Sequence, residues 1–157
     1  MNKTKQRAYI DTSVTGGCED EEFRSWSIQL FEEFRQGLKT AVVSNLTRRE
    51  IEGAPESVKN ILLSIPLTNI ENVFLTEEAE SLAQNYIDDR AVGARHITDA
   101  QHIAIASVER VDVLVSWNFR HIVNIDRIHA FNSVNLKLGY HMLEIRSPRE
   151  VIHEKEV

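Results

Sequence analysis

Cysteine is nearly absent from this sequence, which has only Cys18 among its 157 residues. A single thiol cannot form an internal disulfide or a cysteine-based zinc site, and this agrees with a reducing compartment. No run of about 18 apolar residues occurs, so we expect no membrane span. The apolar stretch behind the basic start MNKTKQR ends at Asp11 and is too short for a signal peptide. We therefore expect a cytoplasmic protein.

The balance of charge limits the classes of partner. The formal net charge is -6, which argues against broad, salt-driven binding to nucleic acid. It does not exclude a nucleic-acid enzyme whose acidic pocket holds cations. Hydrophobic residues make up 42% and charged residues 27% of the chain, as in ordinary globular proteins. We expect one domain, 1–157, that is long enough to bury a core.

Hydrophobic periodicity predicts strands that alternate with helices. The predicted strands are 7–11, 40–44, 71–76, 111–116 and 140–145. The predicted helices are 21–37, 46–52, 55–65, 76–90, 98–110 and 123–139. Such alternation indicates an α/β sandwich with a mostly parallel sheet. No internal repeat, low-complexity tract or linker interrupts the order.

Residues with special conformational roles mark the helix boundaries. Thr47 and Thr76 are expected helix N-caps, and Thr98 with Gln101 three residues later has a capping-box pattern. Glycines are expected to end three helices, at Gly37, Gly93 and Gly139. The 98–110 helix carries a stripe of small and apolar side chains, which predicts close packing on the sheet. The stripe consists of Ala100, Ile103, Ala104, Ser107 and Val108.

Three carboxylates fall where a site is expected in an open α/β sheet. Ligands bind there beyond the carboxyl ends of the strands. Asp11 ends a predicted strand, Glu50 lies on the helix after the second strand, and Asp99 lies in the first turn of the 98–110 helix. If they converge, their repulsion calls for a hard cation such as Mg²⁺ or Mn²⁺. Singly, each also reads as structural: a turn or helix cap, a surface acid, and an acid favoured by the helix dipole.

Other chemistries lack their motifs. None of the six histidines has the H-x₃-H or HExxH spacing of a zinc site, and the GG pair at 16–17 lacks the continuation of a phosphate-binding loop. A dehalogenase-type phosphatase needs a second aspartate after Asp11, where Thr12 and Ser13 follow instead. A response-regulator receiver needs an acidic pair before the end of the first strand and a lysine after the last strand, and neither is present.

Four segments resemble PIN-domain nucleases, especially the VapC-type toxins of bacterial toxin-antitoxin pairs. They are YIDTSV, VVSNLTRREI with its Thr-x-x-Glu, ITDAQHIAIA and VLVSWNFRHI, and their order spans most of the chain. The resemblance implies a three-layer α/β/α sandwich with a central, mostly parallel sheet. It also implies an acidic pocket that uses Mg²⁺ or Mn²⁺ to hydrolyse phosphodiester bonds, usually in RNA. Partners to test are an RNA substrate, a cognate antitoxin protein and a second copy of the chain.

Carried over by position, the family's acidic residues fall on Asp11, Glu50 and Asp99, and its Ser or Thr after the late strand falls on Ser116. The fourth acidic position falls on Asn118, where this chain departs from the family pattern. An amide oxygen can still ligate a metal or orient a water, but one negative charge is lost. The departure leaves open one or two metal sites, and also a catalytically impaired module that binds RNA or a protein.

Several basic and aromatic residues lie near these positions in sequence. Arg48, Arg120 and His121 are candidates for contacts to RNA, with a solvated or core position as the alternative for each. Trp117 is a candidate for base stacking, although an aromatic residue beside a buried strand more often packs. The acidic run at 19–22 is expected to be a solvated face at the start of the first helix.

Overall fold

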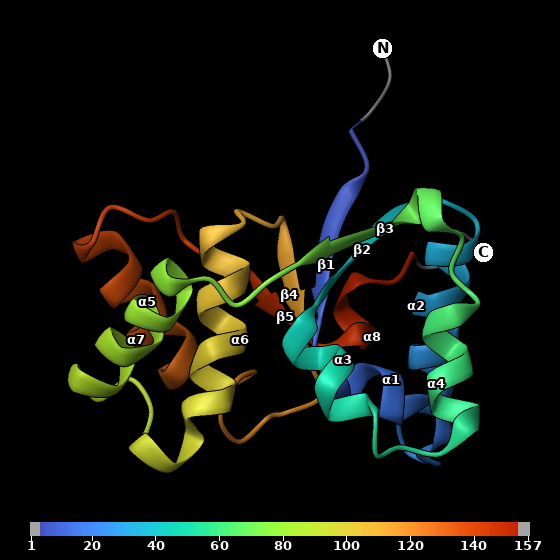
Figure 1. The fold of residues 1–157 in the computed structure, drawn as a ribbon, viewed down its shortest axis with the longest axis horizontal. Coiled ribbons are helices and arrows are strands. Elements are labelled where there is room, and N and C mark those ends of the chain that lie inside the picture. Colours follow the sequence, from blue (N-terminus) through green and yellow to red (C-terminus); the bar gives the residue numbers. More distant parts are fainter. Residues whose placement is uncertain (1–3, 154–157) are drawn as a thin grey trace.

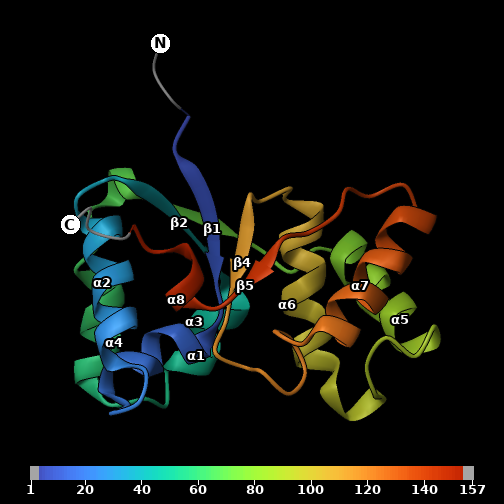
Figure 2. The same cartoon turned by 180° about the vertical axis from the view of Figure 1, so that it is seen from behind.

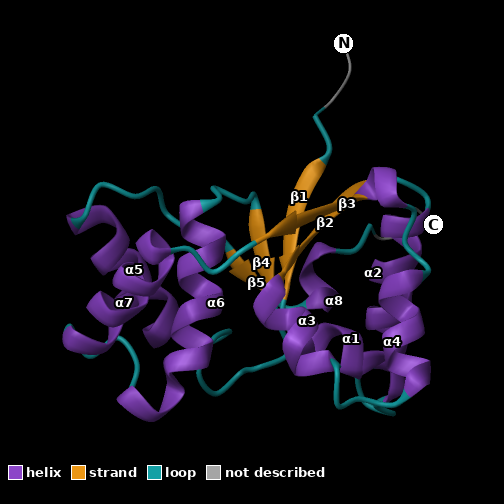
Figure 3. Ribbon diagram, in the orientation of Figure 1, coloured by secondary structure: helices purple, strands orange, loops and turns teal. Residues whose placement is uncertain are grey.

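Five parallel strands form a single sheet at the centre of the computed structural model, which describes residues 4–153. The strands are β1 (Gln6–Ile10), β2 (Lys39–Ser44), β3 (Ile70–Val73), β4 (Val113–Val115) and β5 (Ile145–Arg146). Their order across the sheet is β3-β2-β1-β4-β5, and every neighbouring pair is parallel. Figure 3 shows these strands between two groups of helices. The sheet is entirely parallel, where a mostly parallel one was predicted.

Helices cover both faces of the sheet. They are α1 (Thr12–Gly16), α2 (Arg24–Arg35), α3 (Asn45–Ile51), α4 (Glu56–Leu63), α5 (Glu77–Asp88), α6 (Ile97–Val108), α7 (Ile125–Lys137) and α8 (Pro148–Val151). Single 3-10 turns lie at Gly17–Glu19, Leu67–Asn69 and Ala94–His96. In Figures 1 and 2, α5, α6 and α7 lie on one side of the sheet, and α2, α4 and α8 lie on the other. The predicted three-layer α/β/α sandwich is confirmed.

The strand sequences explain the two layers. In the middle strands, Tyr9, Val42 and Leu114 point into the core shared with α5, α6 and α7. Their neighbours in sequence point the other way, toward α2 and α4: Ala8, Ile10, Ala41, Val43, Val113 and Val115. Strands buried on both faces read as continuous apolar runs rather than as alternating patterns. Within residues 4–153, no helix is long and apolar enough to span a membrane.

The last predicted strand, 140–145, is wrong over most of its length, because β5 contains only Ile145–Arg146. The backbone of Leu143 is held by a side chain of α7 instead of a strand. Its N–H donates to Asn132 Oδ1 at 2.6 Å, and its carbonyl accepts from Asn132 Nδ2 at 3.0 Å. A side-chain amide that satisfies both groups of Leu143 leaves them no role in the ladder.

Of the predicted N-caps, Thr76 is confirmed, since its side chain accepts from the N–H of Ala79. The prediction for Thr47 is wrong: Ser44 caps α3 by accepting from the N–H of Thr47. The capping box at Thr98 is also wrong. Helix α6 begins one residue earlier, at Ile97, after a 3-10 turn that ends at His96. The 3-10 turn runs directly into α6, so the helix begins without a capping box.

At the helix C-termini, Gly37 and Gly139 have φ of 76° and 86° and follow α2 and α7 as predicted. Gly93 does not end α5, which stops at Asp88. The left-handed residue there is Arg90, with φ of 60°. The acidic run at 19–22 is exposed as expected, but it precedes the first turn of α2, which starts at Arg24.

We predict that Ala104→Leu destabilises the fold by about 1–3 kcal/mol, because it overpacks a fully buried position of α6, between the sheet and α5. Thermal unfolding followed by circular dichroism measures the loss. Thr98→Leu places the same side chain at an exposed position of α6 and serves as the control, with a change of at most about 0.5 kcal/mol. Equal stability of Ala104→Leu and the parent chain would contradict the close packing.

Candidate active site

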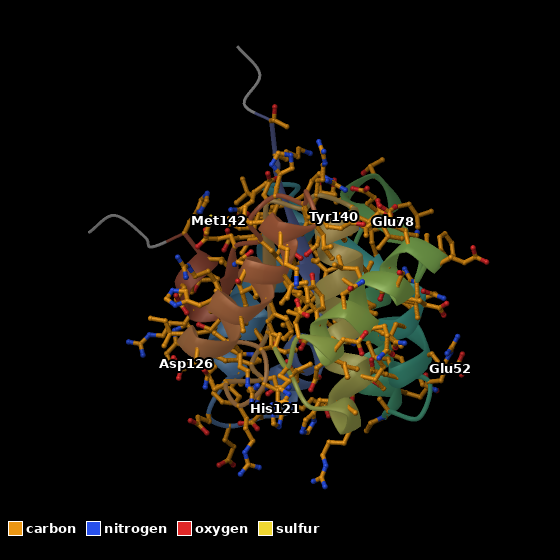
Figure 4. All side chains as sticks on the ribbon, turned by 90° about the vertical axis from the view of Figure 1, so that its left-hand side faces the viewer. Glu52, Glu78, His121, Asp126, Tyr140 and Met142 are labelled. Atoms are coloured by element: carbon orange, nitrogen blue, oxygen red, sulfur yellow. The ribbon has the colours of Figure 1, made fainter. Side chains whose placement is uncertain are left out.

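The candidate residues gather where the parallel strands end. Asp11 follows β1 and Ser116 follows β4, and the backbone N–H of Asp11 donates to the carbonyl of Val115 at 3.4 Å. In Figure 4 the labelled His121 lies at one end of the molecule, whereas Tyr140 and Met142 lie at the opposite end. The His121 end is the one toward which the strands of Figure 1 point. This edge is where an open α/β sheet binds its ligands.

Asp11 is a buried carboxylate held from three directions. Its Oδ1 accepts from Ser13 Oγ at 2.6 Å and from the N–H of Val14 at 3.3 Å, and its Oδ2 accepts from Ser116 Oγ at 2.5 Å. The bond to Val14 makes Asp11 the N-cap of α1, so the cap interpretation is correct. Burial raises the pKa of Asp11 and outweighs these bonds and the charge of His102, which lower it. The ionised form is thus solvated poorly by the protein.

Ser116 connects Asp11 to the loop after β4. The same hydroxyl that donates to Asp11 accepts from the N–H of Asn118 at 2.9 Å. Oδ1 of Asn118 accepts from the N–H groups of Arg120 at 3.2 Å and His121 at 3.0 Å. Its Nδ2 consequently faces Asp99 Oδ1, at 3.4 Å. As assigned from this hydrogen-bond network, Asn118 presents a donor to the site, and its oxygen orders the loop.

Glu50 is held by a chain of buried polar groups. Its Oε1 lies 2.7 Å from Nε2 of His102, and Nδ1 of that ring lies 2.6 Å from the hydroxyl of Tyr9. The Tyr9 hydroxyl is also 2.8 Å from Ser44 Oγ. Burial raises the pKa of Glu50, but the hydrogen bond and charge of His102 outweigh it and hold this pKa below its usual value.

His102 was not singled out in the sequence, yet it is central to the site. It is 3% exposed, and its charge lowers the pKa of Asp11, of Glu50 and of Asp99. A histidine three residues after an aspartate on a helix shares its face, and that spacing from Asp99 was the available signal. Glu50 contacts this imidazole directly, and Asp11 and Asp99 lie near enough for its charge to lower their pKa values.

Asp99 lies in the first turn of α6 and is half-buried. Burial raises its pKa most, and the charge of Glu50 adds to the rise, whereas His102, His121 and His96 oppose it. His96 Nδ1 is 3.9 Å from Asp99 Oδ2. The imidazoles of His96 and His121 stack with their centroids 3.7 Å apart, so Asp99 lies among three histidines.

Two buried polar atoms at this edge have no hydrogen-bond partner in residues 4–153, namely Thr12 Oγ1 and His121 Nδ1. Buried polar atoms usually pair with a protein group or an ordered water, and Thr12 lies near enough to Glu50 to lower the pKa of that carboxyl. Burial and the charge of His96 lower the pKa of His121, and Arg120 and Arg127 act in the same direction. The side of the site near His121 is therefore rich in cationic side chains.

Of the remaining candidates for contact with RNA, only Arg120 is both exposed and, within residues 4–153, free of a side-chain contact that turns it away from the site. Arg120 is exposed, directly after the loop residues that flank Asn118. Arg48 is turned toward β3, because its Nε and Nη2 donate to Asn72 Oδ1 at 3.1 and 2.6 Å. Trp117 is 8% exposed, which agrees with packing rather than with direct contact to RNA.

The donor set suits a hard cation. Carboxylate and hydroxyl oxygens from Asp11, Thr12 and Asp99 are the ligand types that Mg²⁺ and Mn²⁺ prefer. Within residues 4–153, no three His, Cys, Asp or Glu side chains are grouped closely enough to hold a metal ion as they stand. The site is therefore acidic and rich in oxygen, but its carboxylates are engaged with serines and histidines rather than assembled around one point.

The fold and this edge together define a class, the α/β/α sandwich with a parallel sheet and an acidic site at its carboxyl end. No protein-family model matches the sequence, and no curated protein matches it. Several solved structures share the fold, including two at 12% identity. VapC20 of Mycobacterium tuberculosis, a sarcin-ricin-loop-cleaving toxin, matches with a TM-score of 0.54 over 73% of this chain and 92% of that one. VapBC2 from Rickettsia felis, bound to a DNA fragment from their promoter, matches with a TM-score of 0.57 over 90% and 98%.

These neighbours confirm the predicted resemblance at the level of the fold. The chain has the PIN-like architecture of VapC toxin structures, and the matches cover nearly the whole of both neighbours.

We predict that Asp11→Asn raises the thermal stability of the metal-free protein near neutral pH. The folded-state pKa of Asp11 is raised, so ionisation costs more in the folded than in the unfolded chain. The cost is absent below the unfolded pKa, at about pH 4, and grows as the pH rises. The melting temperatures of the two proteins should therefore diverge between about pH 4 and pH 7.

Scanning calorimetry across that range measures the difference, with EDTA present. Asp126→Asn changes an exposed acid of α7 and is the control, for which no divergence is expected. A melting temperature of Asp11→Asn that falls relative to the parent as the pH rises would contradict the desolvation of this carboxylate.

Proposed function

We propose that this chain is a metal-dependent nuclease, an endoribonuclease that hydrolyses phosphodiester bonds with Mg²⁺ or Mn²⁺. The observation that carries the proposal is the buried carboxylate of Asp11. It is 5% exposed, and in residues 4–153 no lysine or arginine pairs with it. Serine or asparagine would cap α1 equally well without the cost of burying a charge. A bound cation would offset the cost of burying the charge of this aspartate.

The arrangement of the carboxylates fits a hydrated ion. Mg²⁺ loses its water reluctantly and is usually bound through one or two carboxylates, with several waters kept. Asp11 and Asp99 would supply these carboxylates, with the unpartnered hydroxyl of Thr12 nearby. A close group of three acidic side chains is therefore not required. The loss of an acid at Asn118 favours one ion over two.

When bound, the ion would make a water more acidic and neutralise charge that builds on the phosphate. Glu50 would accept a hydrogen bond from the attacking water through Oε2, because Oε1 is already paired with His102. Its lowered pKa keeps it ionised and able to accept. Arg120 and His121 would contact the phosphate oxygens on the cationic side of the site.

We further propose that the chain is the toxin of a toxin-antitoxin pair. The two neighbours support this, since one is described as a toxin that cleaves the sarcin-ricin loop and the other as a VapBC complex on promoter DNA. The proposal includes a cognate antitoxin protein, a homodimer, and action in the cytoplasm, where the RNA is.

A catalytically impaired RNA-binding module is the second candidate. Asn118 favours it, because the amide removes a charge and turns its oxygen toward the loop rather than toward Asp99. Titration with Mn²⁺ distinguishes the two functions. A nuclease binds Mn²⁺ and loses that binding in Asp11→Asn, whereas an impaired module binds no Mn²⁺ with or without this substitution.

We predict that the purified protein cleaves single-stranded RNA with Mg²⁺ or Mn²⁺ and stops with EDTA. Asp11→Asn, Glu50→Gln and Asp99→Asn should each lower the cleavage rate by roughly 100-fold or more, because each removes charge that acts in the transition state. Gel electrophoresis of an end-labelled RNA pool measures the rates.

Glu52→Gln is the matched control, since Glu52 is an exposed acid on the same segment as Glu50 and should leave the rate unchanged. Cleavage at the parent rate by Asp11→Asn that is shown to be folded would overturn the assignment of the site.

A further inference from the structure

An aromatic cluster lies beside the candidate active site and has no part in the chemistry proposed above. We call the residues Phe23, Trp26, Trp117 and Phe119 the aromatic cluster. Two of its members, Trp117 and Phe119, flank Asn118, whose amide contacts Asp99. One loop after β4 thus carries both a residue of the acidic site and two aromatic rings.

Trp117 is fixed in place from three sides. Its Nε1 donates to Ser27 Oγ at 2.8 Å, and its ring stacks on Phe23 with centroids 4.1 Å apart and planes at 14°. A Cβ at Gly17 would lie 2.6 Å from Trp117 Nε1 and 2.6 Å from Ser27 Oγ. Glycine is required there because the indole occupies that space. The loop is held rigidly at Trp117, two residues from Phe119.

Phe119 is the exposed ring of the cluster. It is 48% exposed and meets Trp117 edge-on, at 6.0 Å and 61°, and Phe23 at 6.2 Å and 54°. At the far end, the guanidinium of Arg149 lies over Trp26, 5.1 Å from the ring centroid. The buried and covered members of the cluster therefore support one ring that is open to solvent next to the acidic site.

Charged side chains of both signs lie around the aromatic cluster. The exposed acids at 19–22 lie just before Phe23 and repel a phosphodiester backbone from that side. Arg120 follows Phe119 directly, and its charge and that of Arg127 reach His121. A backbone drawn to the guanidinium of Arg120 runs beside Phe119, which leaves its bases free to turn toward that ring. The pattern suits a nucleic acid whose base, rather than its phosphate, meets the ring.

We propose that Phe119, supported by Trp117 and Phe23, stacks an unpaired nucleobase of the substrate next to the phosphate that is cut. This inference rests on the proposed nuclease function and narrows its substrate class. Stacking on an aromatic ring requires a base that has left its helix, and it works for every base because each has a π face. The substrate is then RNA with an unpaired nucleotide at the cut, in a loop or single strand, rather than continuous duplex.

The test measures RNA binding apart from cleavage, in the Asp11→Asn background. The probe is a single-stranded RNA 12-mer with a 5′ fluorophore, with 2-aminopurine at one internal position in a second version. Fluorescence anisotropy gives the affinity, and quenching of 2-aminopurine reports stacking. Phe119→Leu keeps an apolar side chain without a π face and should weaken binding about 5-fold or more, with loss of quenching. Phe119→Trp should retain both.

Two comparisons make the result specific. Tyr140→Leu makes a similar change at the opposite end of the molecule (Figure 4) and should leave affinity and quenching unchanged. A 12-base-pair RNA duplex should bind equally to the parent and to Phe119→Leu, because its bases are already stacked. Melting curves of all variants establish that they are folded.

The outcomes separate this proposal from the one that it rests on. Unchanged affinity and quenching in folded Phe119→Leu overturns the stacking role, even where the parent chain cleaves RNA. Weaker binding in Phe119→Leu without any cleavage by the parent supports stacking and overturns the nuclease instead. An equal loss of affinity for single-stranded and duplex RNA also overturns stacking, because it would point to a contact with the backbone.

Discussion

The candidate active site depends on the buried carboxylate of Asp11. The carboxylate follows β1, caps α1 and accepts from Ser116 after β4, so it joins the neighbouring strands β1 and β4 to the first helix. Its pKa is raised because the cost of burying the charge exceeds the stabilisation of the ionised form by these hydrogen bonds. A buried carboxylate with a raised pKa at a strand end is a candidate functional residue.

The surroundings of Glu50 and Asp99 shift their pKa values in opposite directions. Glu50 is kept ionised by His102, which Tyr9 orients from inside the core. Asp99 is half-buried among three histidines, with a raised pKa. One imidazole thus acts on all three acids, which limits their repulsion before any cation is bound.

Much of this could be predicted from the sequence, and the failures have physical causes. The alternation of apolar strands with periodic helices predicted an α/β sandwich with a mostly parallel sheet, and the family resemblance added the three layers. The strand 140–145 failed because the side chain of Asn132 satisfies the backbone there, which a local pattern cannot reveal. Thr47 and Thr98 failed as caps because Ser44 and the turn ending at His96 take that role. The placement of Asp99 in the first turn of a helix did not depend on which residue capped that helix, and it is correct.

The site was less predictable, because its contacts join segments far apart in the chain. His102 lies 52 residues from Glu50 and 93 from Tyr9, so its role emerges only once the sheet is assembled. The inward turn of the Asn118 amide toward its own loop is likewise a tertiary effect. Arg48 was a reasonable neighbour of Glu50 in sequence, but on a helix its side chain points elsewhere and reaches Asn72.

The proposed nuclease activity requires that a divalent ion bind between the acidic side chains at the end of β1. The most direct measurement is an anomalous difference map from crystals of the parent protein soaked in Mn²⁺. We predict one peak within ligand distance of Asp11 or Asp99, with further waters around it. A peak at another surface, or none at millimolar Mn²⁺ in an otherwise ordered site, would contradict the account.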